Sequence, residues 1–245
     1  MATLELMYED YMTAVGRLIG YLAEGQDYGD LSVGEKSICD GIVQSGYRRF
    51  ITPPMPHVWS FLSPQTTLAV TAAAYIYQLP ADFGSIEGPF TLQSTTSAWS
   101  KIPLVAEAQV RDRHVGNSIT GKPLMAAIRP KAFVGTATGR YEVFFWPAPD
   151  ASYTLQYRYN VQVLRLSQTA LYALGGAVHS ETILECCLWV ADERESDNPQ
   201  SGHKQSAMER LQASIRADLE HAPRSLSVHP LTMEEGWRLA RQIVD

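Results

Sequence analysis

Two helical apolar stripes near the C-terminal end of the chain constrain its fold most, because neither can be buried by the other alone. The first helix is predicted to begin near Ser180 as N-cap, with Glu181 in its first turn. The second is predicted to end at Ala222-Pro223, and the polar segment 197–202 makes the turn between them. We expect their packing partners in the first 52 residues. The stripes consist of Ile183, Leu184, Cys187, Leu188, Val190 and Ala191, and of Met208, Leu211, Ile215 and Leu219.

The N-terminal region contains two further segments with helical spacing. Residues 3–22 form the first, and a linker with Gly and Asp residues follows at 24–30. The second begins with Ser32 and Glu35, which can satisfy each other's backbone N–H groups as a capping box, and it ends at the proline tract 52–56. The apolar positions are Met7, Tyr8, Tyr11, Val15, Leu18, Ile19 and Leu22, then Ile38, Ile42, Val43, Tyr47 and Phe50.

From His57 onward apolar residues alternate instead, which predicts strands. The alternation begins with Trp59 and Phe61, and the turn residues Pro147–Asp150 predict a hairpin between two clear strands. The expected strands are 66–71, 141–146 and 153–159, with weaker ones at 75–79, 90–95, 102–105 and 124–129, a short helix at 106–114 and a glycine hinge at 175–176.

These patterns predict an α+β protein. Its N- and C-terminal helices would form a helical bundle, with an inserted antiparallel β domain that is sandwich- or barrel-like. The discontinuous helical domain would comprise residues 1–56 with 176–223, and the β domain residues 57–175. Residues 224–245 would form a C-terminal arm.

The bulk properties indicate a soluble globular protein without a surface that grips nucleic acid. The 245-residue chain has a net charge of −6, whereas DNA-binding proteins draw affinity from clustered Lys and Arg. We expect no signal peptide and no membrane span, because the sequence has neither a basic leader region nor about 18 consecutive apolar residues. The three cysteines, two of them adjacent at Cys186 and Cys187, are expected to act as small buried hydrophobes.

Gly116–Lys122 matches the first seven positions of a phosphate-binding loop. However, Pro123 stands where a Ser or Thr must bind magnesium, and a strand-like segment follows where the motif needs a helix. We interpret this segment as a Gly-rich surface loop.

An acidic cluster near His203 suggests metal binding at first sight. Its members, Asp192, Glu193, Glu195 and Asp197, lie consecutively around a predicted helix end and point in different directions, which favours a solvated helix end. The sequence also lacks the zinc-ligand spacings and the Gly-x-Ser-x-Gly nucleophile motif. We therefore expect no catalytic, cofactor-binding or metal-binding residues, although a triad assembled from distant positions would escape this reasoning.

Aromatic residues are concentrated in the β segment, where alternation favours a sandwich core over a platform that stacks sugars or bases. Alternation does not account for residues 75–83. There Pro80 fixes φ and Asp82 can cap the turn with its side chain, which predicts a sharp corner pinned by Phe83. The corner residues are Tyr77, Leu79, Pro80, Asp82 and Phe83.

This corner resembles the Tyr-x-Leu-Pro-x-Asp-Phe signature of head-to-tail adaptor (connector) proteins of tailed bacteriophages. Further similar stretches, which together span residues 35–222, are Gly46–Phe50 before the prolines and Trp59–Leu62, the turn Trp146–Asp150 followed by Tyr153–Tyr159, and His179–Glu185 with a late Asp218.

The resemblance implies a virion protein of the neck that is not an enzyme and is synthesised in the host cytoplasm. It implies a homo-oligomeric ring, typically of twelve copies, beneath the portal protein and above downstream tail or nozzle/terminator proteins. It also implies that DNA passes through the ring without sequence-specific binding. An acidic ring fits such a channel, because like charge lets DNA pass without sticking.

The C-terminal arm has the pattern of one more amphipathic helix. Thr232–Glu235 predicts a capping box, and Arg238 lies near the C-terminal end, where the helix dipole favours cations. The apolar stripe either packs on its own domain or docks on a neighbour, and similar adaptors engage the portal with a C-terminal extension, which favours docking. The expected portal-binding residues are Met233, Trp237, Ala240, Arg241 and Val244, with Trp237 as the anchor.

Two other classes stay open on sequence alone. One is another virion or tail component that uses its β domain to contact a protein or a glycan. The other is an enzyme with a dispersed site.

Overall fold

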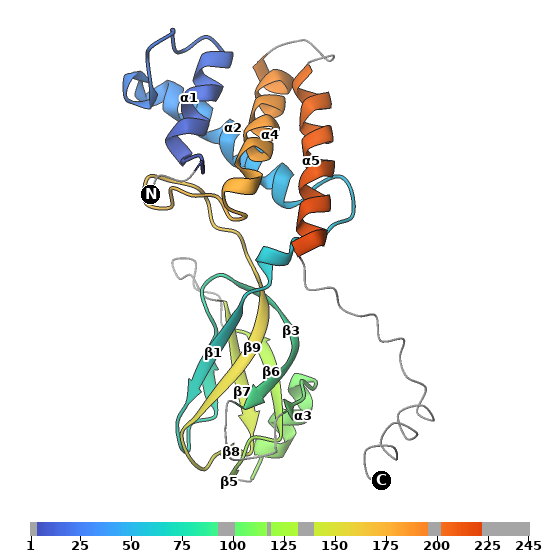
Figure 1. The fold of residues 1–245 in the computed structure, drawn as a ribbon. Helices are drawn as coiled ribbons and strands as arrows, with labels where there is room; N and C mark the ends of the chain where they lie inside the picture. Colours follow the sequence, from blue (N-terminus) through green and yellow to red (C-terminus); the bar gives the residue numbers. More distant parts are fainter. Residues whose placement is uncertain (1–3, 93–100, 117–118, 132–139, 196–201, 222–245) are drawn as a thin grey trace, which may run out of the picture.

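A computed structural model describes residues 4–92, 101–116, 119–131, 140–195 and 202–221 of the chain. Helices form one end of the elongated molecule and a β sandwich forms the other (Figure 1). The chain starts in the helical domain, passes through the β domain and returns to the helices. The predicted α+β fold with an inserted antiparallel β domain is therefore confirmed.

Four helices, α1, α2, α4 and α5, form the helical domain, and α4 lies at its centre. Helix α4 packs against α1, α2 and α5, so most of its circumference is buried. One apolar cluster joins all four helices, which confirms that the terminal stripes pair with each other. The elements are α1 (Tyr8–Leu18), the 3₁₀ turn η1 (Tyr28–Asp30), α2 (Val33–Ile51), α4 (Ala177–Glu195) and α5 (Gly202–His221).

Helix α2 begins and ends as predicted. Ser32 is its N-cap, and the reciprocal hydrogen bonds of the capping box join Ser32 and Glu35 at 2.8 and 3.4 Å. Helix α2 then crosses α4 at Gly46, where an added Cβ would lie 2.5 Å from the Cα of Cys187. The missing side chain at Gly46 therefore sets how closely the two helices approach.

Two predictions about the C-terminal helices are wrong. Ser180 is not an N-cap: α4 begins at Ala177, directly after Gly175 and Gly176, both of which have positive φ. The Ser180 side chain is buried inside the helix, where its hydroxyl donates to the Ala177 carbonyl. Leu219 was expected in the core stripe of α5, but it is 57% exposed, because the polar neighbour Asp218 takes the buried position.

The β domain is a sandwich of two antiparallel sheets with strand orders β1-β9-β3-β4 and β2-β7-β6. Helix α3 (Glu107–His114) packs on β6 and β7, and a parallel pair, β5 with β8, lies at the end of the domain remote from the helices (Figure 1). The strands are β1 (Gln65–Val70), β2 (Ile76–Gln78), β3 (Phe83–Leu92), β4 (Lys101–Ile102), β5 (Thr120–Gly121), β6 (Met125–Pro130), β7 (Tyr141–Trp146), β8 (Ala148–Pro149) and β9 (Tyr153–Val161).

The predicted hairpin between residues 141–146 and 153–159 is wrong. Strand β7 pairs with β2 and β6, whereas β9 pairs with β1 and β3 in the other sheet. The apolar faces of the two sheets meet across the core, where the rings of Phe145 and Phe90 lie 5.4 Å apart. The turn residues Pro147–Asp150 contain β8 and carry the chain from one sheet to the other.

Trp59 and Phe61 do not begin a strand, as their alternation had predicted. Trp59 directly precedes the 3₁₀ turn η2 (Ser60–Leu62), and Phe61 lies within it. The Trp59 side chain is fully buried in the apolar cluster of the helical domain. Its indole N–H donates to the carbonyl of Phe50 at 3.1 Å, and the two rings lie 4.5 Å apart. Both aromatic side chains point toward the helices because that core, not a sheet, lies beside this segment.

Strand β1 lies at the edge of its sheet. The Tyr159 N–H donates to the Pro64 carbonyl, so every second residue from Pro64 onward directs its backbone groups toward β9. The intervening residues, such as Thr67, direct theirs away from the sheet. At the end of this edge the Tyr77 hydroxyl contacts both backbone groups of Thr71 at 2.9 Å.

The division into folding units, residues 1–56 with 176–223 around 57–175, stays a prediction. Apolar contacts separate one cluster in the helices from another in the sandwich. The two segments that connect the domains also contribute to the helical cluster, because Trp59 and Leu166 belong to it.

Candidate interaction surfaces

A polar network joins the last turn of α5 to the segment that enters the β domain. The carboxylate of Asp218 accepts hydrogen bonds from the backbone N–H of Ser60 at 3.0 Å and from its hydroxyl at 2.5 Å. It also lies 2.9 Å from Nε2 of His57. Both side chains of the His57–Asp218 pair are less than a tenth exposed, so this contact, which we call the junction network, is shielded from water.

The junction network brings together the residue types of a hydrolytic triad, but not in the order that catalysis needs. A nucleophilic Ser must transfer its proton to the imidazole, and the carboxylate must orient that imidazole from behind. Here the Ser60 hydroxyl donates to Asp218 instead. The arrangement joins α5 to the segment 57–60 and does not activate a nucleophile.

A groove lies along α2 in the helical domain, where the segment after β9 returns across the helix. We call it the α2 groove; its volume is about 430 Å³, and it is lined by Gly41, Gln44, Ser45, Tyr47, Arg48, Ile51, Val163, Leu164 and Arg165.

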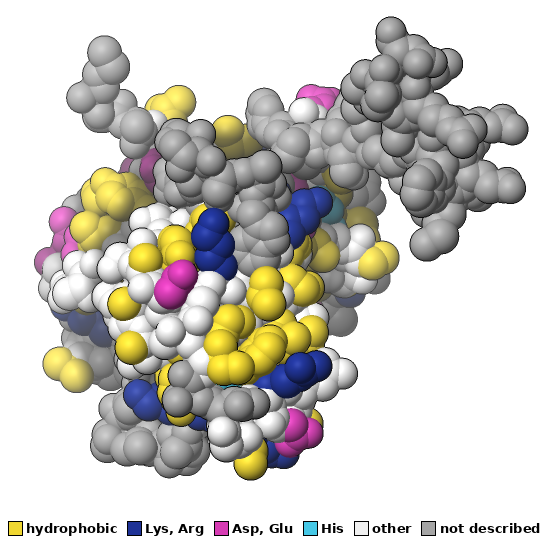
Figure 2. Space-filling model, turned by 90° about the horizontal axis from the view of Figure 1, so that it is seen from below, with side chains coloured by type: hydrophobic (Ala, Val, Ile, Leu, Met, Phe, Trp, Pro, Cys, Tyr) yellow, Lys and Arg dark blue, Asp and Glu magenta, His cyan; other side chains and the backbone are white. Residues whose placement is uncertain are grey.

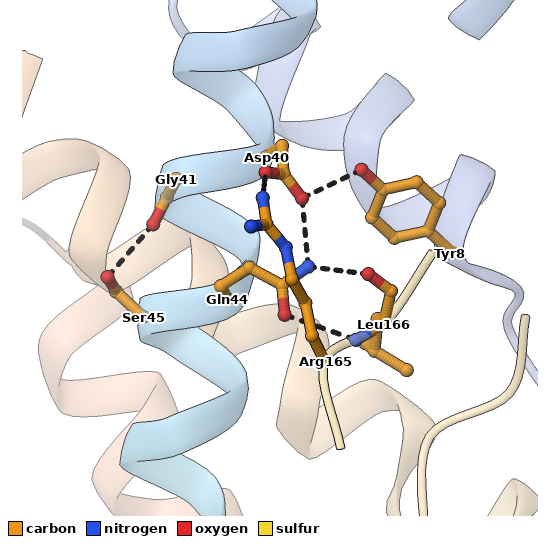
Figure 3. Close-up of polar contacts among 7 residues, drawn as sticks. All are labelled: Tyr8, Asp40, Gly41, Gln44, Ser45, Arg165 and Leu166. Atoms are coloured by element: carbon orange, nitrogen blue, oxygen red, sulfur yellow. Dashed lines mark hydrogen bonds and ion pairs between the residues drawn. The ribbon is translucent and has the colours of Figure 1, made fainter. Parts of the chain in front are cut away.

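Polar contacts fix one wall of the α2 groove (Figure 3). Asp40 pairs with Arg165 and accepts from the Tyr8 hydroxyl at 2.8 Å. Gln44 bonds both backbone groups of Leu166, donating to the carbonyl at 2.8 Å and accepting from the N–H at 3.1 Å. Asp40 and Gln44 therefore hold the segment after β9 on α2 through Arg165 and Leu166.

Two arginines, Arg48 and Arg165, line the α2 groove. Arg165 is paired with Asp40, and Arg194 of α4 donates to the hydroxyl of the lining residue Ser45 at 2.7 Å. The Arg48 side chain is exposed, and within the described part of the chain its guanidinium group makes no hydrogen bond or ion pair. The groove thus exposes one guanidinium, that of Arg48, without a carboxylate partner among the described residues, in a chain whose net charge is −6.

Exposed apolar side chains gather at the remote end of the β domain (Figure 2). Val115 is 75% exposed and Ile119 is 50% exposed. Beside them the ring of Tyr75 stacks on His114 at 4.3 Å, and the His114 Nε2 lies 2.9 Å from the Phe145 carbonyl. This end, which we call the distal surface, contains a hollow lined by Ala73, Tyr75, His114, Gly116, Ile119, Thr120 and Ala148.

The predicted corner residues lie where β3 begins, with Leu79 and Phe83 buried in the sandwich core. The Phe83 N–H donates to the Pro80 carbonyl at 3.1 Å, which closes the turn. The Asp82 carboxylate was expected to cap this turn. It instead accepts a hydrogen bond from the Tyr159 hydroxyl at 3.2 Å. Because these residues serve the fold, the corner is not itself a binding surface.

The segment that resembles a phosphate-binding loop lies on the distal surface. Thr120 and Gly121 form β5, and the next regular element, β6, is a strand that begins at Met125. No helix N-terminus is available there to face a phosphate. Asn117 and Ser118 lie outside the described residues.

The acidic cluster is spread over several contacts. Asp192 is buried, whereas Glu193 pairs with Arg49 at 2.8 Å. Burial alone would raise the pKa of Glu193, but the hydrogen bond and charge of Arg49 hold it below its usual value. His203 pairs with Glu185 at 3.0 Å instead, and Asp197 lies outside the described residues.

The three cysteines are buried and unpaired, as predicted. Burial raises the pKa of Cys39 to about 11 and of Cys186 to about 12, so both remain thiols at neutral pH. Cys187 lies against α2, where its Sγ is 3.7 Å from the Val43 carbonyl.

The residues expected to bind the portal lie outside the described part of the chain, which ends at His221. Sequence reasoning missed the α2 groove and the junction network. The one local signal for the network was the polar residue Asp218 beside the apolar stripe of α5.

Residues 8–229 match the protein family described as SU10 adaptor protein, so the match covers both domains. The chain belongs to this family. No curated protein matches it. Membership makes it a structural adaptor of a tailed bacteriophage, as the corner signature had suggested. Among the described helices of this SU10 adaptor, none is long and apolar enough to cross a bilayer.

Proposed function

We propose that this SU10 adaptor forms a ring in the neck of the virion, docked beneath the portal protein and continuing the DNA channel toward the tail. Family membership over residues 8–229 is the observation that carries the proposal. The elongated two-domain shape supports it, because opposite ends of one subunit can contact different neighbours (Figure 1).

The proposed assembly is homo-oligomeric, with about twelve copies as in the adaptors that the sequence resembles. DNA passes through it without sequence-specific contacts, since the net charge of −6 does not favour phosphate binding. The chain is made in the host cytoplasm and acts without a cofactor, a metal ion, a catalytic site or a membrane.

The C-terminal arm, residues 224–245, docks on the portal in this proposal. Its attachment point is set by the junction network, because α5 ends at His221, only three residues after Asp218. Trp237 is the proposed anchor, with Met233, Ala240, Arg241 and Val244 along the same helix.

The β domain contacts the downstream tail or nozzle proteins through its distal surface. Exposed apolar residues gathered around a hollow are typical of protein-binding sites. The same observation favours the second candidate function, a tail or neck component that uses this surface for a protein or glycan without binding the portal.

Native mass spectrometry of the purified chain, alone and with its portal protein, tests the proposal. We expect a closed ring, or a monomer that forms a ring on the portal, and deletion of residues 224–245 should abolish attachment while leaving a folded protein. A monomer that ignores the portal but binds a tail protein through the distal surface would establish the second candidate instead.

A further inference from the structure

The loop between α1 and α2 forms an acidic projection at the start of α2. All four charged residues between positions 23 and 35 are acidic: Glu24, Asp27, Asp30 and Glu35. Hydrogen bonds from the N-cap Ser32 lower the pKa of Glu35, which keeps it ionised. Val33, next to this N-cap, is 87% exposed. We call residues 23–35 the acidic tip.

The shape of the acidic tip is fixed by its own backbone contacts. Asp27 accepts from the Gly29 N–H at 2.7 Å, and Asp30 accepts from the Asp27 N–H at 3.0 Å. Arg17 donates to the Gln26 carbonyl at 2.8 Å, which ties the loop to α1. The Lys36 ammonium lies 4.5 Å from the centre of the Tyr28 ring and offsets part of the negative charge of the tip. The tip therefore presents several carboxylates and one apolar side chain on a preorganised turn, which reduces the entropy lost on binding.

The α2 groove has the complementary properties. Arg48 in its lining, and Arg194, which contacts the lining residue Ser45, are cations that match the carboxylates of the tip, whereas Arg165 is already paired with Asp40. Leu164 on its wall is 66% exposed, so an apolar contact is available beside the charges. Opposite charges around a small apolar contact are the arrangement expected of two surfaces that bind each other.

The acidic tip cannot reach the groove of its own chain. Both are built on α2, an uninterrupted helix, with Val33 at its first residue and the groove lining beginning at Gly41. Eight residues of rigid helix hold these two positions about 12 Å apart, and Arg48 lies farther along the same helix. A tip can therefore fill only the groove of another copy.

We infer that the acidic tip of one copy docks in the α2 groove of the next, and that this contact builds the ring. Two different surfaces of the same chain then meet head to tail, which is the type of contact that closes into a ring when the rotation per copy allows it. The inference rests on the proposed ring and names the surfaces that form it.

Two full-length variants test the contact, each placing a like charge in it. In the groove, Arg48→Glu adds a carboxylate that faces the tip; in the tip, Val33→Arg adds a cation that faces the groove. Each should lower the assembled fraction at least tenfold in native mass spectrometry, with the portal protein present if the wild type needs it. Arg216→Glu is the matched control, because Arg216 is an exposed arginine on α5 that belongs to neither surface.

Mixing the two variants gives the sharper result. Arg48→Glu retains a normal tip and Val33→Arg retains a normal groove, so the first contact between the two variants is the wild-type one. The second contact sets the new cation at position 33 against the new carboxylate at position 48, and these charges attract. An equimolar mixture should therefore recover rings in which the two variants alternate, although neither variant assembles alone. Raising the salt concentration should weaken wild-type assembly, because exposed charges are screened.

The possible failures are distinguishable. If the wild type forms rings and both variants form them equally well, the tip and groove do not build the contact, although the proposed function stands. If circular dichroism shows that a variant is unfolded, Arg48→Gln and Val33→Ser replace it, and normal assembly by both would equally refute the inference. A wild type that forms no ring, alone or on the portal, refutes the proposed function as well.

Discussion

Replacing Gly46 with Ala should destabilise the protein, although the same change strengthens most helices. An added Cβ would lie 2.5 Å from the Cα, 2.7 Å from the N and 2.7 Å from the Sγ of Cys187. Carbon atoms pack best at about 3.5–4.0 Å, so α2 and α4 would have to separate by roughly 1 Å. Because the obstructing atoms are mostly backbone, we take the upper end of the cost of overpacking, about 3 kcal/mol. Ala gains about 1 kcal/mol over Gly in a helix, which leaves a net loss of about 2 kcal/mol.

Urea unfolding followed by far-ultraviolet circular dichroism measures this loss. With a slope of about 3 kcal/mol per molar urea, the midpoint should fall by roughly 0.7 M. Gly41→Ala is the control on the same helix, since its nearest new contact would be Arg194 at 3.9 Å, and it should raise stability by up to about 1 kcal/mol. If Gly46→Ala unfolds at or above the wild-type midpoint, the close approach at this position does not limit the packing of the two helices.

Three further predictions concern the junction, the open sheet edge and the response to alkali. Asp218→Ala should lower the free energy of unfolding in urea by about 3–5 kcal/mol, because it leaves buried partners of the carboxylate unpaired. Leu219→Ala, at the exposed neighbouring position, is the control and should change that free energy by less than about 0.5 kcal/mol. Equal effects of the two substitutions would contradict the role of the junction network. Thr67→Pro should leave a folded protein, whereas Thr66→Pro should not, because only Thr66 directs its N–H into the hydrogen-bond ladder between β1 and β9. Amide hydrogen exchange of β9 measures the difference. Burial raises the pKa of Tyr47 to about 12, so its neutral form stabilises the fold below pH 10, and this contribution should be lost as the pH rises toward 12; titration of unfolding between pH 8 and 12 should show a smaller decline for Tyr47→Phe.

Features that depend on neighbours in the sequence were predictable. The capping box of Ser32 and Glu35 needs only their spacing of three residues and a helix behind them. The start of α4 was not predictable in the same way. Ser180 has the side chain of an N-cap, but the hinge Gly175–Gly176 allows the helix to begin earlier and the core buries Ser180 within it.

Strand alternation indicated which face of each strand is buried, but not which strands pair. In β9 the residues Leu155, Tyr157 and Tyr159 are buried, as their spacing predicted. Their partners lie in β1 and β3, up to 91 positions away in the registered pairs, and nothing in the local pattern specifies them. Short turns favour a hairpin, but packing the two sheets face to face overrode that preference here.

The candidate surfaces were not predictable from the sequence because their residues converge only in the folded chain. His57 and Asp218 are 161 positions apart, and Arg165 is 125 positions from Asp40. An isolated arginine or histidine has no periodic neighbour that would single it out. The family resemblance depended instead on the order of four short stretches, among them the corner at Pro80, where the Phe83 N–H donates to the Pro80 carbonyl within a local turn.

In the proposed assembly, the junction network orients the two ends of one subunit relative to each other. The helical and β domains have separate apolar clusters, so apolar packing alone does not fix one domain on the other. At the crossing, Asp218 of α5 bonds the backbone as well as the side chain of Ser60, which orients the segment leading into β1. Hydrogen bonds constrain direction more strongly than apolar contacts do, because they require alignment of donor and acceptor. Polar contacts at the crossing therefore suit the proposed role, in which the α2 groove and the distal surface keep a defined relation across the subunit.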